Sequence, residues 1–500
     1  MSGSGDGPAE PAGAPEPGEL LAARRAKLER LRADGVEPFP HDFPGVGPIA
    51  AAHAAHAALG AGEDTDAGYR VAGRLAARRG QGKMAFLDLV DRSGRVQLQA
   101  KLDVLGEEQM ERLLGLDLGD ILGVDGVAFR SRRGELTLRV DAFTPLAKSL
   151  RPPPDKFHGL SDVETRFRRR ELDLMASEDT RALFITRAKI VTAVRRQLDD
   201  EGFLEVETPV LQPIYGGALA RPFTTHHNEL DRTLYLRIAT ELYLKRCIVG
   251  GLEKVYELGK DFRNEGVSFK HNPEFTVLEF YEAYADYEDM ATRLEALVAA
   301  AAVAAEYDGE LDFSAPWRRI SFVGAIAEAT GIDLLEHRDA EALAGAIRER
   351  GLDMPTEGLS WPALADDLLS KHVEPGLIQP TIVKDYPVEL SPFAKAHRSL
   401  PGLTERFEAF CGGMEIANAF SELNDPDVQR ERFAAQTRLA EAGEEEVQPH
   451  DEAFLAALEQ GMPPTGGIGV GIDRLVMLLT GRRSIREVVL FPAMRDTREP

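Results

Sequence analysis

Apolar and polar residues alternate along much of the segment from residue 67 to residue 147. Five short runs there are rich in β-forming residues and are separated by glycine-bearing turns: YRVAGRLAARR, MAFLDLVD, RVQLQAKL, GDILGVDGVAF and GELTLRV. A period of two is typical of strands that bury one face. Five short strands in so small a segment predict a β-barrel, and the five-stranded OB-fold, which binds oligonucleotides on its face, fits this pattern.

Helical periodicity precedes the predicted barrel. The run ELLAARRAKLERLRADG begins at Glu19, places its leucines on one side of a helix and ends at Gly35. We therefore expect a helical extension over residues 19–66. Residues 1–18 are rich in glycine, alanine and proline and carry neither a signal-peptide nor a transit-peptide pattern, so they predict a disordered tail.

A second domain is predicted after a proline-rich linker. The linker is predicted over residues 148–161 and contains SLRPPPDKFHGLS, and α and β patterns mix from residue 162 to residue 500. A helix is expected over Phe184–Asp200, followed by the strand FLEVETPVL. Because Pro209 cannot donate a hydrogen bond, this strand is expected at a sheet edge or an interface. The segment from about 286 to 370 is predicted to be largely helical.

Composition agrees with a chain of several domains. A chain of 500 residues with 43% hydrophobic content exceeds what one core usually holds. Its two cysteines, Cys247 and Cys411, support no disulfide framework, which favours a cytoplasmic location. The most apolar run, Ala296 to Ala305, is shorter than the roughly 20 residues of a membrane span. We expect no membrane association.

Charge restricts where a nucleic acid could bind. The net charge of −24 opposes nonspecific binding, but residues 70–101 carry a local excess of six positive charges. On the second predicted strand Phe86 and Asp88 share a face, and Gln97 lies on the third. An aromatic ring for base stacking beside an amide is typical of single-strand recognition. A solvated charged face, with Phe86 in the barrel core, is the alternative.

A β-hairpin with dense charge is predicted from KVYELGKDFR through NEGVSFKHNP to EFTVLEFYEAY. Arg263 lies just before the turn, where its planar guanidinium could bridge a phosphate and a carboxylate. The turn adds groups suited to a polyphosphate, namely Glu265, Lys270 and His271. On the outgoing strand one face carries Phe275, Val277, Glu279 and Tyr281. A surface hairpin with solvated charges is the alternative.

A second candidate is RFEAFCGGMEIANAFSELND, residues 406–425. Glu408 and Glu415 are seven residues apart, which places them on opposite faces of a flat strand unless the chain bends. The pair Gly412-Gly413 could supply that bend, and two converging carboxylates suit a divalent cation. Three later residues share one face: Asn418, Phe420 and Glu422. Solvated acidic residues without a metal are the alternative.

A third candidate is PPTGGIGVGIDRLVMLLTG near the C-terminal end. Its Gly-x-Gly-x-Gly spacing differs from the dinucleotide-binding fingerprint, and too little chain follows for a βαβ unit. Glycines allow a ligand to approach the backbone closely, and Arg474 at the start of the next helix could face the same ligand. A glycine-rich turn with a surface arginine is the alternative.

Four blocks together resemble the class II aminoacyl-tRNA synthetases, and most closely the bacterial-type lysyl-tRNA synthetases. They are GGALARPFTTHHNELDRTLYLRIATELYLKR, FRNEGVSFKHNPEFTVLEFYEAYADY, GGMEIANAFSELND and GIGVGIDR, and the resemblance extends from about Glu19 to Arg495. It implies an α+β chain, with an OB-fold anticodon-binding barrel and a catalytic antiparallel sheet flanked by helices. It further implies a homodimer that activates L-lysine with ATP and transfers it to the 3′ end of tRNA(Lys) for translation.

The resemblance also assigns residue roles. Arg263 and Arg474 would be catalytic, and the ATP site would consist of Arg263, Glu265, His271, Phe275 and Arg474. Lysine would be bound by Gly217, Glu241, Arg263, Glu279, Tyr281, Asn418, Phe420 and Glu422. Mg²⁺ would be held by Glu408 and Glu415. The anticodon would contact Arg78, Phe86, Gln97 and Glu135.

This chain departs from the family pattern at two places. Ala417 and Ala419 stand where many members have glycine, and the stretch IAAAHAAHAALGAGEDTDAG before the barrel has no assigned role. Three rival functions are an enzyme that lysylates a protein, a synthetase for another amino acid and a non-enzymatic relative. The barrel argues against the first, Tyr281 with Glu422 against an acidic substrate, and the retained catalytic groups against the third.

Overall fold

The computed structural model describes residues 17–80, 82–154, 160, 162–441 and 447–495. The chain forms two compact units, Met1–Ser161 and Asp162–Pro500. The predicted tail lies outside the described residues except for its last two, Pro17 and Gly18, and so does part of the predicted linker.

The first unit is built around a closed five-stranded barrel with strand order β1-β2-β3-β5-β4. The OB-fold prediction is therefore confirmed. Its strands are β1 Asp64–Arg79, β2 Met84–Asp91, β3 Gly94–Lys101, β4 Ile121–Arg130 and β5 Leu136–Ala147. Its helices are α1 Pro17–Ala33, α2 Ile49–Ala55 and α3 Leu102–Gly115.

The alanine- and histidine-rich stretch before the barrel has a packing role. It forms α2, which places Ile49 and Ala52 in the hydrophobic core of the barrel. Beyond the helix, the His56 Nε2 and the Tyr69 hydroxyl are 2.9 Å apart, so the stretch is attached by polar as well as apolar contacts.

The second unit contains an eight-stranded sheet in the order β12-β13-β14-β15-β16-β11-β10-β6. Its strands are β6 Leu204–Glu205, β10 Lys254–Phe262, β11 Glu274–Ala283, β12 Arg318–Ser321, β13 Thr381–Lys384, β14 Arg406–Cys411, β15 Met414–Ser421 and β16 Thr465–Gly471. The six strands from β13 to β10 are antiparallel, but both outermost pairs are parallel, so the expected antiparallel sheet is mixed at its edges. A smaller sheet pairs β7 Leu211–Gln212, β9 Arg232–Leu236 and β8 Thr224–His227 in that order.

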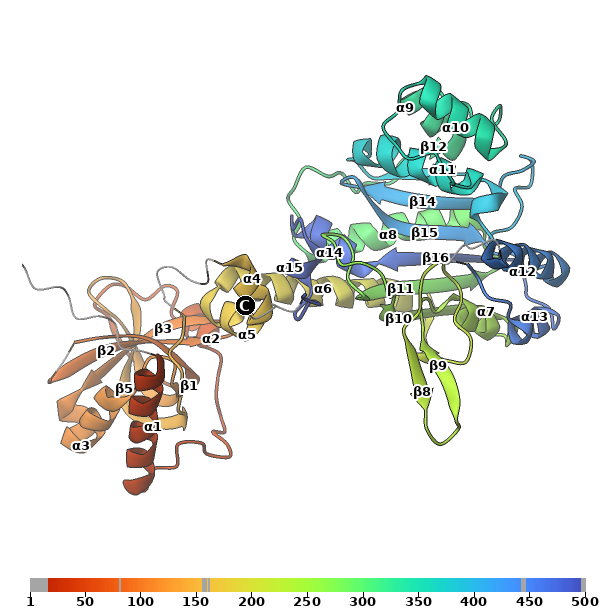
Figure 1. Ribbon diagram of the computed structural model, residues 1–500. Coiled ribbons are helices and arrows are strands. Elements are labelled where there is room, and N and C mark those ends of the chain that lie inside the picture. The colour runs from red at the N-terminus through yellow and green to blue at the C-terminus, as the bar shows by residue number, and fades with distance from the viewer. Residues whose placement is uncertain (1–16, 81, 155–159, 161, 442–446, 496–500) are drawn as a thin grey trace, which may run out of the picture. The chain divides into compact units, whose positions relative to one another are not determined.

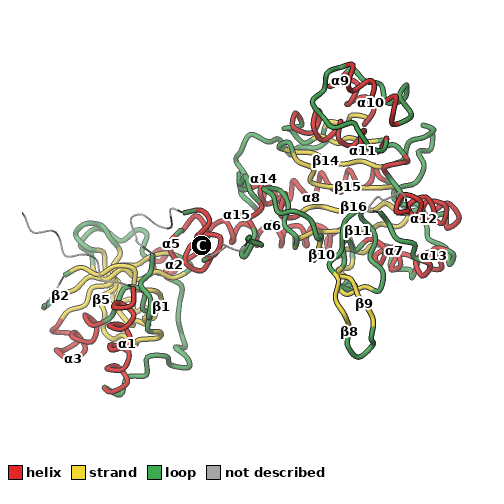
Figure 2. Tube along the Cα trace, in the orientation of Figure 1, coloured by secondary structure: helices red, strands yellow, loops and turns green. Residues whose placement is uncertain are grey.

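Helices cover one face of the large sheet, as Figures 1 and 2 show for α6 and α8. The helices of this unit are α4 Val163–Arg168, α5 Arg170–Ala176, α6 Glu178–Asp200, α7 Glu241–Val249, α8 Tyr287–Ala304, α9 Phe322–Thr330, α10 Ala340–Glu349, α11 Trp361–Leu368, α12 Pro426–Glu441, α13 Glu452–Leu458, α14 Ile472–Leu479 and α15 Ile485–Val488. Alternate residues of the central strands pack with α6, α8 and α14 in the largest core. Because strand side chains alternate between faces, the other residues point to the opposite face.

Two expectations about the start of this unit need correction. The helix predicted from Phe184 begins at Glu178, because the Ser177 hydroxyl caps it by accepting a hydrogen bond from the Thr180 amide at 3.1 Å. The strand predicted over FLEVETPVL is reduced to the two-residue strands β6 and β7 on either side of Pro209. β6 does lie at the sheet edge, as a proline-interrupted strand should.

The segment predicted to be largely helical has two structural roles. Its first helix, α8, packs against the sheet, whereas α9, α10 and α11 build a separate core beside β13. Between them lies the short strand β12, which pairs in parallel with β13.

Candidate active site

A cavity of about 410 Å³ lies on the face of the large sheet that the helices leave open, over β11, β16 and β15. The strand register explains it. Glu279 on β11 and Asn418 on β15 both pair with Gly469, while Tyr281 and Phe420 both pair with Gly467. Directly opposed residues point to the same face of a sheet. The middle strand therefore contributes backbone without side chains, and a trough runs between two walls.

The glycines of β16 serve different purposes. A Cβ on Gly467 would overlap the Tyr281 ring and the Glu422 carboxylate, so glycine is required there by neighbouring protein groups. A Cβ on Gly469 would meet only Glu279 Cγ, at 3.7 Å, which leaves space above that residue for a ligand. The segment is a strand of the floor, which excludes the glycine-rich turn considered above.

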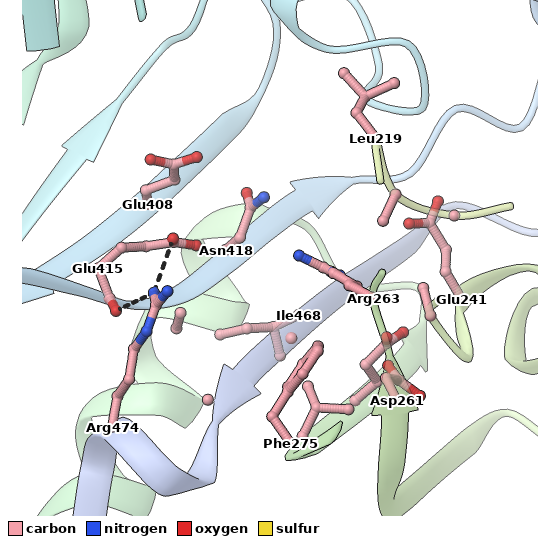
Figure 3. Close-up of a pocket in the computed structure, with 18 of the residues that line it drawn as sticks. Leu219, Glu241, Asp261, Arg263, Phe275, Glu408, Glu415, Asn418, Ile468 and Arg474 are labelled. Atoms are coloured by element: carbon pink, nitrogen blue, oxygen red, sulfur yellow. Dashed lines mark hydrogen bonds and ion pairs between the residues drawn. The ribbon is translucent and has the colours of Figure 1, made fainter. Parts of the chain in front are cut away.

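Arginines and an aromatic ring occupy one end of the cavity. The Arg263 guanidinium carbon lies 5.2 Å from the centre of the Phe275 ring, a cation–π distance. Arg474 donates to the Glu415 carbonyl at 2.8 Å and to its carboxylate at 3.1 Å, as the dashed lines in Figure 3 mark. Burial and the neighbouring Arg474 and Lys270 cations lower the pKa of His271, so this imidazole is neutral at pH 7.

Glu408 and Glu415 meet although their spacing is odd. They lie on β14 and β15, which are joined by a turn at Gly412 and Gly413, both with positive φ. The register also shifts by one residue between the pairs made by Ala409 and Phe410. Burial raises the pKa of Glu408 to about 7; nearby Arg406 opposes the shift and Glu415 adds to it. Two neighbouring carboxylates of this kind favour a bound cation.

Sequence reasoning missed Arg406, which connects these groups. Its guanidinium donates to Glu408 at 2.6 Å and to the Asn418 amide oxygen at 3.2 Å. The Tyr386 hydroxyl donates to the other Glu408 oxygen at 2.9 Å. Since Arg406 occupies the amide oxygen, the Asn418 nitrogen is left to donate into the cavity. The signal was available, because Arg406 and Glu408 are two residues apart on one strand and share a face.

The other end of the cavity is acidic. The Tyr281 hydroxyl donates to Glu279 at 3.1 Å, and the Thr240 amide donates to the other Glu279 oxygen at 3.1 Å. Burial, together with the Asp261 and Glu241 carboxylates, raises the pKa of Glu279 to about 8. Glu241, at the start of α7, lines the same end.

Gly217 lines the acidic end from a loop. Its amide donates to the side chain of Gln448 at 3.0 Å, and Gln448 is fully buried. Gln448 therefore holds this loop, a role that no motif in the sequence indicated.

Glu422 is the one predicted residue of this unit that does not line the cavity. Its side chain is fully buried behind Gly467 and Tyr281, and it forms an ion pair with Lys245 at 2.5 Å. Lys245 also donates to Glu241 at 2.5 Å. Burial raises the pKa of Glu422 to about 8 despite the opposing effect of Lys245. All the other predicted residues of this unit lie around the one cavity: Gly217, Glu241, Arg263, Glu265, His271, Phe275, Glu279, Tyr281, Glu408, Glu415, Asn418, Phe420 and Arg474.

Comparison with known proteins decides the family. The model of the class II tRNA synthetases (D, K and N) matches residues 162–495. A lysine–tRNA ligase of Moorella thermoacetica is 50% identical over 490 residues, which cover 96% of this chain and 99% of that protein. The lysine–tRNA ligases of Roseiflexus castenholzii and Carboxydothermus hydrogenoformans are 52% and 49% identical, over 95% of this chain and 99% and 98% of theirs.

The chain belongs to the class II lysine–tRNA ligases.

A second match concerns the barrel of the first unit. The model of the OB-fold nucleic acid binding domain matches residues 69–146. Together with the synthetase match, it confirms both the resemblance seen in the motif blocks and the α+β fold class. Among the described residues, no helix combines the length and apolar character needed to cross a membrane.

The outer face of the barrel brings together three of the four residues assigned to the anticodon. Gln97 donates to Glu135 at 3.1 Å and accepts from Thr137 at 3.1 Å. Phe86 is half-buried and stands outside the barrel core, which excludes the alternative that it is a core residue. These side chains form a polar surface with one aromatic ring.

The fourth residue, Arg78, is directed elsewhere. Its guanidinium donates to the carbonyl groups of Leu114 and Leu116 at the end of α3. The neighbouring Arg79 pairs with Phe86 across the strands and forms an ion pair with Asp88 at 3.2 Å. In this structure Arg79 thus lies on the Phe86 face, together with Arg95, which forms ion pairs with Asp88 and Glu135 at 3.4 Å each.

Proposed function

We propose that this chain activates L-lysine with ATP to form lysyl-adenylate and then transfers the lysyl group to the 3′ end of tRNA(Lys). One observation carries the proposal: a single cavity joins an arginine and aromatic end to an acidic end. ATP is an anion with an aromatic base, and lysine is an amino acid with a second ammonium group. The two ends therefore match the two substrates in charge and shape.

The acidic end supports binding of lysine. We assign the α-ammonium to Glu241 and Gly217, and the side-chain ammonium to Glu279, Tyr281 and the deeper Glu422. A buried ammonium group needs paired anions and acceptors to offset its desolvation. The α-carboxylate would contact Arg263 and Asn418, and Phe420 would pack against the aliphatic chain.

The opposite end supports binding of ATP. We assign adenine stacking to Phe275, whose ring already lies beside Arg263. Glu265 and His271 lie near the nucleotide, and Arg474 would contact the phosphates after leaving Glu415. A neutral His271 can donate or accept a hydrogen bond without adding charge.

Glu408 and Glu415 are the residues that would hold Mg²⁺. Among the described residues no group of three or more His, Cys, Asp or Glu side chains is arranged for a metal, so these two carboxylates would hold the ion together with ligands from outside the protein, such as phosphate oxygens and water. Burial, with a contribution from the Glu415 carboxylate, raises the pKa of Glu408. A cation bound between the two carboxylates would stabilise their charged forms, which supports the fit. When bound, the metal would supply positive charge against the charge that develops on the phosphates.

The residues support adenylate formation by positioning and electrostatics. A carboxylate oxygen of lysine attacks the α-phosphorus of ATP in line and forms the mixed anhydride, while pyrophosphate leaves. Arg263 would contact both reacting groups and stabilise the pentavalent transition state. A ribose hydroxyl of the terminal tRNA adenosine then attacks the lysyl carbonyl, and AMP leaves. No protein side chain acts as a nucleophile in this scheme.

Recognition of tRNA is assigned to the outer face of the barrel. Phe86 would stack on an anticodon base, and Gln97 with Glu135 would read base edges. Arg78 stays a candidate for this face only if its guanidinium leaves the carbonyl groups at the end of α3.

Assembly and location complete the proposal. Leu204 on β6 and Leu211 on β7 are about half exposed, at 53% and 49%, and Val210 between them is 41% exposed. Apolar residues beside a short edge strand support a homodimer formed through this edge. The cysteines Cys247 and Cys411 are both free, which supports a cytoplasmic location.

Lysine-dependent exchange of pyrophosphate into ATP tests the function. We expect lysine to support far more exchange than any other amino acid in a panel that includes aspartate, asparagine and ornithine. If lysine supports no more exchange than aspartate or asparagine, the assignment of the substrate is wrong.

A further inference from the structure

A fully buried lysine lies at the acidic end of the cavity and is absent from the assigned lysine site. Lys245 is one helical turn after Glu241 on α7, and its side chain has no solvent exposure. Its ammonium is 2.5 Å from both Glu241 and Glu422 and 5.0 Å from the centre of the Phe393 ring. A buried ammonium between two carboxylates is a fixed part of the charge balance of the pocket.

The acidic end has more carboxyl groups than positively charged groups. Three buried carboxylates, Glu241, Glu279 and Glu422, interact there with one another. Lys245 is the ammonium group that faces them among the described residues. The nearby Arg406 also interacts with Glu241, but its ion pair is with Glu408. The next acidic group, Asp261, is 3.1 Å from Arg237 and interacts with Arg263. Complete pairing of the three carboxylates therefore requires two positive charges in addition to Lys245.

Free lysine brings those two charges, on its α-ammonium and its side-chain ammonium. An amino acid with a neutral side chain brings one, so one of the buried carboxyl groups keeps its proton and makes no ion pair with the ligand, and the binding energy of that ion pair is lost. Glu422 retains capacity for a further donor, because Lys245 contacts one of its two carboxylate oxygens and no described residue donates a hydrogen bond to the other.

We propose that Lys245 is a specificity-determining residue of the pocket: as a resident counter-ion, it sets at two the number of positive charges that the amino acid must supply. This inference rests on the proposed assignment of the lysine pocket and adds to it a residue that does not line the cavity. Lys245 acts through Glu241 and Glu422, so it is a positioning residue rather than a catalytic one.

The test compares lysine with 6-hydroxynorleucine, which has a side chain of similar length and only one ammonium group. The readout is the ratio of kcat/KM for the two in pyrophosphate exchange. Glu422→Gln leaves two carboxylates and Lys245, so one added charge suffices, and we expect the ratio to fall at least a hundredfold. Adding Lys245→Met restores the need for two charges, and we expect the ratio to recover at least tenfold over Glu422→Gln alone.

A merely structural role for Lys245 predicts the opposite pattern, because a second disruption of the pocket would not restore preference for lysine. The inference is overturned if the double variant shows a ratio no higher than that of Glu422→Gln. Should the double variant fail to fold in a thermal unfolding measurement, Lys245→Gln combined with Glu422→Gln carries the same expectation and the same refutation.

A matched control is Lys254→Met on β10. Lys254 also forms an ion pair, 2.8 Å from Glu282, but Glu282 does not line the cavity as Glu241 does, so loss of Lys254 should leave the ratio unchanged. Exchange by the wild-type protein distinguishes a failure of the proposed function from a failure of the role of Lys245. If it shows no lysine-dependent exchange, the proposed function fails. If it exchanges with lysine but the double variant does not recover the ratio, only the role of Lys245 fails.

Discussion

Binding of lysine should release protons, because two carboxyl groups of the acidic end have raised pKa values in the ligand-free protein. The pKa is raised to about 8 for both Glu279 and Glu422, chiefly by burial. At pH 7 a group with this pKa is about nine-tenths protonated. An ammonium group placed beside it favours the charged form and lowers its pKa. Binding of lysine should therefore drive a proton off each group.

The expected release at pH 7 is between one and two protons per lysine bound. The upper limit of about two follows if both groups ionise fully, and their mutual repulsion lowers it. The sign follows from linkage. Protonated carboxyls compete with lysine below about pH 8, so the affinity for lysine rises with pH up to about 8, and loss of the α-ammonium proton of lysine itself ends the rise above that. The slope should approach tenfold per pH unit for each proton released.

Isothermal titration calorimetry at pH 7.0 measures this release directly. Titrations of lysine in phosphate and in Tris differ in binding enthalpy by the number of protons released multiplied by the difference in buffer ionisation enthalpy. Glu279→Gln should reduce the release by about one proton, and Lys254→Met should not change it. A release below about 0.3 proton in the wild-type protein would show that both carboxyls are already ionised in the free pocket, and would refute the reasoning.

Two further predictions concern the floor of the cavity and the barrel. Gly467→Ala places a methyl group against Tyr281 and Glu422, and overpacking of about 1–3 kcal/mol should raise KM for lysine about 5- to 150-fold in the exchange assay. Gly345→Ala, where a Cβ meets nothing within 4 Å, is the control, and an unchanged KM in Gly467→Ala would contradict the role of the glycine floor. Phe86→Ala should lower kcat/KM for charging of tRNA by the loss of one stacking contact, about 1–3 kcal/mol, and leave exchange nearly intact. An equal loss of charging and exchange would exclude the anticodon role of Phe86.

Local patterns were sufficient for several parts of the fold and site. Period-two alternation correctly placed Phe275, Glu279 and Tyr281 on one face of β11, and all three line the cavity. The same rule would have found Arg406 from its spacing to Glu408. Such relations depend on residues close together in the chain, where strand geometry alone decides which way a side chain points.

Those local patterns could not predict which distant segments pack side by side. The position of Gly467 between Tyr281 and Phe420 depends on β16 lying between β11 and β15, and no local pattern specifies that order. The burial of a side chain could not be predicted from local patterns either. Period-two alternation places Glu422 on the cavity face of the predicted strand, but its side chain lies behind the residues that line the cavity. Lys245 is a charged residue on a helix, where a surface position is usual, yet its side chain is fully buried.

The glycine-bearing strand β16 has a consequence for engineering the substrate range. The floor of the cavity is main chain, held on both sides by β11 and β15, so random mutagenesis cannot deepen it. Every change in the capacity of the pocket has to come from its walls. Variants intended to accept longer or modified lysines should therefore be sought by shortening Tyr281 and by altering α7, while Gly467 and Gly469 are left unchanged.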